Sequence, residues 1–350
     1  MKKINNLTKS INWKLWLGLL ISALFLFLAF REVDLARTWA VIKSADLFYL
    51  SLTVIITFFH FVIRSWRWGI LLEPIKKTGY FNRLSSTLIG FAANCLLPAR
   101  LGEFIRANYL GNRENISGSS TFGTVVVERL FDGFTLLLIL MVGLIYTTFP
   151  EKWQSMSSSL RGAGYLMLLF YVFVIIFLVG FKYKARLFLT LFDRILFFLP
   201  HNPRSKIIDI SWNFSLGLVL TKNPFRLAQA VFYSLILWFS ALCQIQLVEN
   251  AIGITLPFIA TFLILAMAQF GVAIPSAPGF IGTFHLAVQY GFLFYGIGRE
   301  EALSAAIIWH AAFFFPTILF GFISFLLLHI SFEKLSKDPN ILKNGSISEP

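Results

Sequence analysis

Residues 163–181, AGYLMLLFYVFVIIFLVGF, contain no charged side chain and decide the class of fold. A helix needs roughly 20 mostly apolar residues to cross the hydrocarbon core of a bilayer. Comparable apolar stretches lie at 13–30, 47–63, 123–148, 228–248 and 303–330. The sequence therefore predicts an all-α, polytopic membrane helix bundle with six full spans.

The composition agrees with a chain that is surrounded mostly by lipid. Of the 350 residues, 57% are hydrophobic and 13% are charged, and the mean hydropathy is +0.75. Soluble domains carry about 25% charged residues. The net charge of +13 is explained by Lys and Arg on the cytoplasmic side of a membrane, next to anionic lipids. We therefore expect membrane lipids, and no nucleic acid, as partners.

The positions of Lys and Arg in the loops predict the orientation. Segment 182–226 carries eight of them, interleaved with Phe and Leu: Lys182, Lys184, Arg186, Arg194, Arg204, Lys206, Lys222 and Arg226. This pattern is typical of amphipathic stretches on the inner membrane surface. We expect a cytoplasmic N-terminus (1–12), a single transmembrane domain (13–330) and a cytoplasmic tail (331–350) in a bacterial cell membrane.

Two further hydrophobic regions, about 84–110 and 257–298, are interrupted by Pro and Gly. The interrupting residues are Pro98 and Gly102 in the first region, and Pro275, Pro278, Gly279 and Gly282 in the second. Broken backbone at membrane depth is tolerated only where protein or water surrounds it. Both regions are therefore predicted to be broken hairpins, and the second either enters and leaves on one side or crosses twice.

The two hairpins share a short pattern, because Pro98-x3-Gly102 matches Pro275-x3-Gly279. Each is followed by a long apolar helix with one notable ionisable residue, Arg129 or His310. In the predicted topology they enter the membrane from opposite faces, which is typical of an inverted repeat. Such repeats place a substrate site near the midplane, where the broken helices meet.

Charged residues inside a span cost about 2.5–3.5 kcal/mol each on insertion scales and need an explanation. Glu128, Arg129 and Asp132 lie within one apolar run. They are either a self-paired, hydrated helix end or one side of a polar pocket. In the second case they face the charged residues of the first hairpin, Arg100, Glu103 and Arg106. Arginine forks in such a pocket suit phosphate oxygens.

The second hairpin adds candidate polar contacts. We expect a cavity lined by Asn94, Arg100, Glu103, Arg129, Ser276 and Thr283. His285 and His310 are either packed histidines or contacts for a proton or a headgroup, and His60 has the same two interpretations. The run Arg64-Ser65-Trp66-Arg67-Trp68 is interpreted as an interface anchor, with headgroup contact as the alternative.

Several motifs of other function classes are missing from the sequence. It has no phosphate-binding glycine loop with lysine, no paired-His metal helix and no Ser-centred elbow. We therefore expect no metal, no cofactor and no ATP-driven pumping without a partner.

Three motifs together resemble the flippase-like family named after the transmembrane region of lysylphosphatidylglycerol synthase. They are Asn94-x3-Pro98-Ala99-Arg100-Leu101-Gly102-Glu103-x2-Arg106, Glu128-Arg129-x2-Asp132 and Pro275-x2-Pro278-Gly279-x2-Gly282. The resemblance covers about 15–330. It implies movement of a lipid between leaflets, and in bifunctional relatives a cytosolic aminoacyltransferase accompanies this region. The family often has an acidic residue at the position of His285 and an arginine at that of His310.

The sequence therefore predicts a protein that binds and translocates a lipid with an anionic headgroup. Its substrate would be a phospholipid derivative or a polyprenyl-phosphate-linked sugar. One alternative is an intramembrane transferase that uses Glu103, Glu128 or Asp132 as a general base. Another is an accessory membrane subunit of cell-envelope lipid synthesis.

Overall fold

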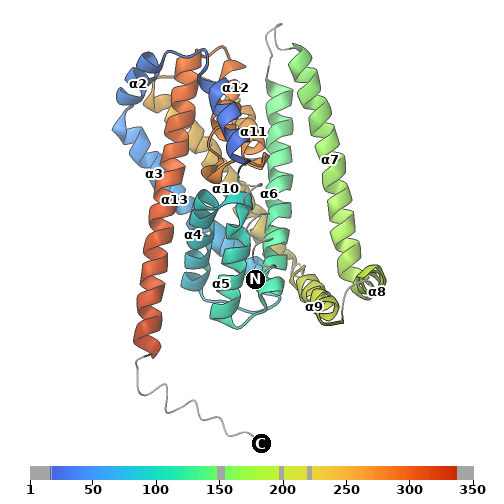
Figure 1. The fold of residues 1–350 in the computed structure, drawn as a ribbon. Helices are drawn as coiled ribbons and strands as arrows, with labels where there is room; N and C mark the ends of the chain where they lie inside the picture. Colours follow the sequence, from blue (N-terminus) through green and yellow to red (C-terminus); the bar gives the residue numbers. More distant parts are fainter. Residues whose placement is uncertain (1–15, 17, 148–153, 197–200, 219–222, 337–350) are drawn as a thin grey trace, which may run out of the picture.

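The computed structural model describes residues 16, 18–147, 154–196, 201–218 and 223–336, and in this part of the chain the regular elements are helices (Figure 1). After an N-terminal helix, Gly18–Phe30, the order is α2 (Leu35–Lys43), α3 (Leu47–Leu72), α4 (Tyr80–Leu96), η1 (Pro98–Arg100), α5 (Gly102–Glu114), α6 (Gly118–Tyr146), α7 (Gln154–Tyr183), α8 (Ala185–Ile195), α9 (His201–Gly217), α10 (Pro224–Ala251), α11 (Ala260–Ala273), η4 (Pro278–Phe280), α12 (Thr283–Leu293) and α13 (Arg299–Ser336). The predicted all-α class is confirmed.

Four of the described helices are long and apolar enough to cross a membrane, and they lie in α3, α7, α10 and α13. Helix α6 has 29 residues, but Glu128, Arg129 and Asp132 interrupt its apolar sequence. The N-terminal helix is short, at Gly18–Phe30. The exact number of spans therefore stays a prediction.

Two helical hairpins point toward each other from opposite halves of the molecule (Figure 1). The first, α4–η1–α5, occupies the lower half of the view, and the second, α11–η4–α12, the upper half. Pro98 opens η1 and Pro278 opens η4, because a proline ring fits a first helical turn and interrupts a longer helix. The two tips are in contact, since Arg100 Nη2 donates a hydrogen bond to the carbonyl oxygen of Val272 at 3.1 Å.

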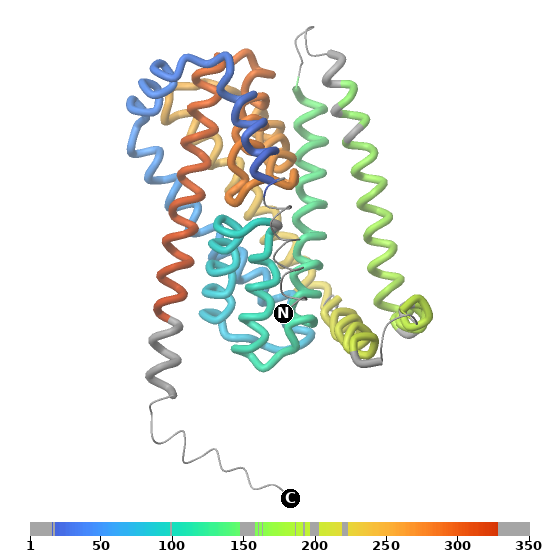
Figure 2. Tube along the Cα trace, in the orientation of Figure 1, coloured from blue at the N-terminus to red at the C-terminus, as the bar shows by residue number. Residues whose placement is uncertain are grey.

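The N-terminal helix packs against the second hairpin (Figure 2). The backbone N–H of Ala277 donates to Ser22 Oγ at 2.8 Å, and Gln289 Nε2 donates to the carbonyl oxygen of Ala29 at 3.2 Å. A hydrophobic core of α10, α11, α12 and α13 side chains, such as Leu237 and Ile264, surrounds the same hairpin. The upper tip is therefore held by protein on several sides.

Segment 182–226 contains α8, α9 and the start of α10 (Figure 1). Both α8 and α9 lie at the end of the molecule where α5 ends. Two helices lie where two amphipathic stretches were expected, but only α8 separates its apolar and polar side chains clearly. Their position on a membrane surface remains a prediction.

Candidate functional site

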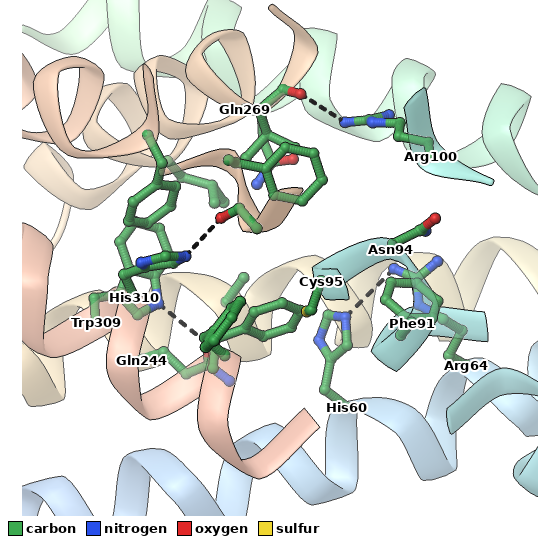
Figure 3. A pocket seen from close by; sticks show the side chains of 18 of the residues that line it. His60, Arg64, Phe91, Asn94, Cys95, Arg100, Gln244, Gln269, Trp309 and His310 are labelled. Atoms are coloured by element: carbon green, nitrogen blue, oxygen red, sulfur yellow. Dashed lines mark hydrogen bonds between the residues drawn. The ribbon is translucent and has the colours of Figure 1, made fainter. Parts of the chain in front are cut away.

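A cavity of about 150 Å³ lies between the two hairpin tips (Figure 3). A single water needs roughly 10–15 Å³ on the same measure, so the cavity has room for a group of several heavy atoms. Its polar lining residues are His60, Arg64, Asn94, Arg100, Glu103, Arg129, Gln244, Gln269 and His310. Its aromatic lining residues are Phe91, Trp238, Phe280, Phe284, Trp309, Phe313 and Phe314.

The first tip holds Arg100 at the edge of this cavity. Asn94 Oδ1 accepts a hydrogen bond from the backbone N–H of Gly102 at 2.8 Å, which closes the turn between α4 and α5. Arg100 has a left-handed backbone, with φ of 53°, which is uncommon for a residue other than glycine. Among the described residues, no carboxylate lies within 4.0 Å of the Arg100 guanidinium. Its charge is therefore free to meet an anion.

The second tip has the same backbone feature. Phe280 has a φ of 60°, and the two glycines on either side of it, Gly279 and Gly282, have φ values of 74° and 93°. His310 Nε2 lies 2.8 Å from the carbonyl oxygen of Gly279, to which it donates a hydrogen bond. A left-handed residue other than glycine costs on the order of 1–3 kcal/mol and persists only where its surroundings hold it.

A set of ion pairs lies beside the cavity, and we call it the arginine–carboxylate cluster. It consists of Arg64, Arg67, Arg106, Arg129, Glu103, Glu128 and Asp132. Arg64 Nη1 lies 2.7 Å from Glu128 Oε1 and 3.0 Å from Asp132 Oδ2. Arg67 Nη1 lies 2.7 Å from Asp132 Oδ1 and donates to Ser234 Oγ at 2.8 Å. The cluster therefore joins α3, α6 and α10.

The remaining two arginines bring the first hairpin into the cluster. Arg106 Nη2 lies 3.3 Å from Glu128 Oε1, and the Arg106 guanidinium stacks over Trp68 at 4.9 Å from the ring centroid. Arg129 Nη2 lies 3.1 Å from Glu128 Oε1, and Arg129 Nε lies 3.5 Å from Glu103 Oε1. The α4–α5 hairpin is thus tied to α6 by charge as well as by packing.

The cluster contains more positive than negative charge. Four guanidiniums face three carboxylates, which leaves one positive charge, and Arg100 adds a second at the cavity edge. Several buried guanidinium nitrogens, including Nε and Nη1 of Arg106, have no hydrogen-bond acceptor among the described residues. Uncompensated charge in a low-dielectric interior is unfavourable. The site is therefore suited to a group with one or two negative charges.

The structure brings together most of the residues that the sequence predicted for the cavity. Asn94, Arg100, Glu103 and Arg129 line it, and so does His310. Glu128, Asp132 and Arg106 lie next to it, with side chains that are 0%, 5% and 1% exposed. The alternative of a hydrated, self-paired helix end is wrong for Glu128 and Asp132, because arginines from other helices surround them.

Two predicted lining residues lie elsewhere. Ser276 and Thr283 are not part of the cavity wall; Thr283 Oγ1 donates to Ser276 Oγ at 3.2 Å inside the second hairpin. His285 is also behind the wall, with its ring centroid 4.8 Å from that of His310. The break in the backbone of the second hairpin was predicted correctly. The side chains of Ser276, Thr283 and His285, however, point toward their own hairpin and not into the cavity.

The interface-anchor interpretation of the run from Arg64 to Trp68 is wrong for its two arginines. Arg64 and Arg67 have side chains that are 3% and 0% exposed. Trp66 alone points outward and is 47% exposed. A helical spacing of four and three residues places His60, Arg64 and Arg67 on one face. This shared polar face is the feature of the sequence that could have predicted a polar contact inside the protein.

Comparisons with known proteins cover nearly the whole chain. The profile described as "Lysylphosphatidylglycerol synthase TM region" matches residues 15–321. A UPF0104 membrane protein of Pyrococcus horikoshii is 23% identical over 324 residues, which are 88% of this chain and 96% of that protein. A UPF0104 membrane protein of Methanocaldococcus jannaschii is 24% identical over 246 residues, 70% of this chain and 97% of that protein.

A shorter match involves a protein with a named activity. The glycosyltransferase AglD of Haloferax volcanii is 29% identical over 136 residues, which are 37% of this chain and 22% of that protein. These three relatives are archaeal. A multi-pass membrane protein is supported, while a bacterial membrane and cytoplasmic termini stay predictions.

Proposed function

Because this chain belongs to the family of the lysylphosphatidylglycerol synthase transmembrane region, we propose that it binds and translocates a membrane lipid with an anionic headgroup. The observation that carries the proposal is the excess positive charge at the cavity between the hairpin tips. Guanidinium groups pair well with phosphate oxygens. The aromatic part of the lining provides apolar contacts for the less polar part of the lipid.

The hairpins supply the moving parts in this proposal. We propose that α4–α5 and α11–α12 are the two halves of an inverted repeat with the substrate at their meeting point. Contacts between the hairpins include the hydrogen bond from Arg100 to the carbonyl of Val272. Hydrogen bonds of this kind are readily exchanged for hydrogen bonds to a headgroup. We therefore propose that the two tips separate toward one face of the membrane at a time.

Two classes of headgroup fit the same chemistry. One is a phospholipid derivative, and the other is a sugar linked to polyprenyl phosphate. The second class is supported by the match to a glycosyltransferase. Both carry a phosphate for the arginines, and they differ in the polar group that would meet Asn94, Gln269 and Gln244.

A leaflet-resolved assay in proteoliposomes tests the proposal. Fluorescent phosphatidylglycerol in the inner leaflet should become accessible to an impermeant quencher when the protein is present. Arg100→Gln should abolish this movement, and Lys184→Gln, at an exposed position, should preserve it. Mass spectrometry of the same lipids is the second readout. A new covalent product would instead favour the transferase alternative, and unchanged movement with Arg100→Gln would contradict the assigned site.

A further inference from the structure

A second recess, of about 470 Å³, lies apart from the central cavity, and no residue lines both. It is formed by the last turns of α3, the connection to α4 and the first turns of α10. Leu218, just after α9, belongs to the same hydrophobic cluster as Ile70 of its wall. The recess is therefore at the end of the molecule that carries α8 and α9 (Figure 1). We propose that it binds the phosphodiester headgroup of an anionic membrane lipid, as a site separate from the translocation cavity.

The charges in the recess favour an anion. Lys77, Arg83 and Arg226 contribute three positive charges, and Glu73 contributes one negative charge. Arg226 Nε lies 3.1 Å from Glu73 Oε2, so these two neutralise each other. Among the described residues, no carboxylate lies within 4.0 Å of the charged groups of Lys77 or Arg83. Glu114 lies beyond that distance from Arg83 and accepts hydrogen bonds from Gly79 and Asn82. Lys77 and Arg83 are therefore the cations left to attract a ligand.

Arg83 is held in place by backbone groups, not by a counter-ion. Its Nε donates to the carbonyl oxygen of Ser65 at 3.2 Å, and its Nη1 donates to the carbonyl and the hydroxyl of Thr78. The described residues accept no hydrogen bond from its Nη2. The guanidinium is thus oriented in advance, with one donor edge remaining for a phosphate oxygen.

A glycine in α3 makes the room for this guanidinium. A Cβ atom at Gly69 would lie 2.7 Å from Arg83 Cζ and 2.9 Å from its Nη2. Glycine inside a helix costs about 1 kcal/mol relative to alanine. The position of Gly69 is therefore explained by the need for Arg83 to lie flat against α3.

Aromatic side chains around the recess identify a lipid as the occupant. Trp66 is 47% exposed. Its ring lies 6.0 Å from that of Tyr80 and 6.3 Å from that of Tyr233, measured between centroids. Tyr and Trp gather at the level of lipid headgroups. A phosphate group next to Arg83 would therefore have apolar and aromatic surface beside it for the glycerol and the first part of the acyl chains.

The test is a titration of the detergent-purified full chain with dioctanoyl phosphatidylglycerol, followed by native mass spectrometry. Arg83→Gln should weaken binding of one lipid at least about ten-fold, since a hydrogen bond to a charged group contributes about 1.5–3 kcal/mol. Lys77→Gln should weaken it about five-fold, from roughly 1 kcal/mol for a basic residue near the headgroups. Lys184→Gln is the matched control, an exposed cation at the same end, and should have no effect.

Further variants and ligands distinguish lipid binding in the recess from binding in the translocation cavity and from binding of free phosphate. The titration is repeated in an Arg100→Gln background, which removes the arginine at the edge of the translocation cavity. Arg83→Gln should weaken the remaining phosphatidylglycerol binding by the same factor there, so the result does not depend on the translocation proposal. Dioctanoyl phosphatidylcholine should bind at least ten-fold more weakly than phosphatidylglycerol. Inorganic phosphate that displaces the lipid at equal concentration would identify a free-phosphate site and overturn the lipid assignment. Lys77→Gln, at an exposed position, keeps the test valid if Arg83→Gln does not fold, and unchanged affinity in it would contradict the proposal.

Discussion

The guanidinium carbon of Arg100 lies 5.5 Å from the centroid of the Phe280 ring, and this contact joins the tips of the two hairpins. Both residues have left-handed backbones, with φ of 53° and 60°. Two residues in an unfavourable conformation therefore meet at the edge of the cavity. The arrangement holds the arginine in one orientation while its hydrogen-bonding edge can reach a headgroup.

Removing the ring from this pair tests how Arg100 is positioned. Phe280→Leu should weaken the binding of phosphatidylglycerol about two- to five-fold, because an exposed cation–π contact contributes about 0.5–1 kcal/mol. Native mass spectrometry of the purified protein measures the change. Phe322→Leu, at a position that is 57% exposed, is the control for loss of an aromatic ring, and an equal effect in both variants would contradict a role for the contact.

Substitutions in the arginine–carboxylate cluster should affect protein stability and lipid binding to different degrees, depending on whether the arginine lines the cavity. Arg67→Ala should lower the free energy of unfolding by about 2–5 kcal/mol, because it removes the closest of the three arginine partners of Asp132 and leaves a cavity where a fully buried side chain lay. Arg129 has a side chain that is 31% exposed and lines the cavity. Arg129→Ala should therefore destabilise the protein less and weaken lipid binding more. Thermal melting and lipid binding, measured on the same samples, give both quantities.

A double variant checks the cause of the Arg67 effect. Arg67→Met with Asp132→Leu should cost less than the sum of the two single variants, because each single variant already removes their shared contact at 2.7 Å. Additive costs would instead mean that packing of the arginine, and not its pairing with Asp132, explains the loss. From the sequence alone we expected Arg67 to lie at the membrane interface, and its complete burial contradicts that expectation.

Much of the fold could be predicted because its signals are local. Long apolar runs predict helices such as α7 and α10, and Pro98 and Pro278 mark the breaks at which η1 and η4 form. These features depend on a few neighbouring residues and on the absence of water. The meeting of the two tips followed from the same reasoning, since neither broken segment satisfies its backbone alone.

The side chains of the site were harder to predict because their partners are distant in sequence. Arg64 and Arg67 follow apolar residues and alternate with tryptophans, as an interface anchor does, while their carboxylate partners lie in α6. Helical spacing could have identified the shared face of His60, Arg64 and Arg67, but not the helix that covers it. Ser276 and Thr283 illustrate the converse, since a break in the backbone does not determine which way its side chains turn.

The distribution of Lys and Arg predicts the orientation in the membrane. In a background with Cys95→Ala and Cys243→Ala, Lys184→Cys between α7 and α8 should react only with a membrane-permeant thiol reagent in intact cells. Lys43→Cys, at the end of α2, should react with an impermeant one. Both positions are exposed, so access depends on the side of the membrane. The opposite labelling pattern would invert the topology and place the α8–α9 end outside.

Close approach of α4 and α5 depends on Gly102, where a Cβ atom would lie 1.8 Å from the carbonyl oxygen of Gly90. Backbone atoms cannot move aside without separating the two helices, so Gly102→Ala should lower the melting temperature strongly. Gly180→Ala is the matched control, because a Cβ there meets nothing within 4 Å. In the interior of α7 it should be neutral or stabilise by up to about 1 kcal/mol. If the two variants had the same melting temperature, the hairpin would tolerate a wider spacing between α4 and α5. The placement of Arg100 by Asn94 and Gly102 would then need another explanation.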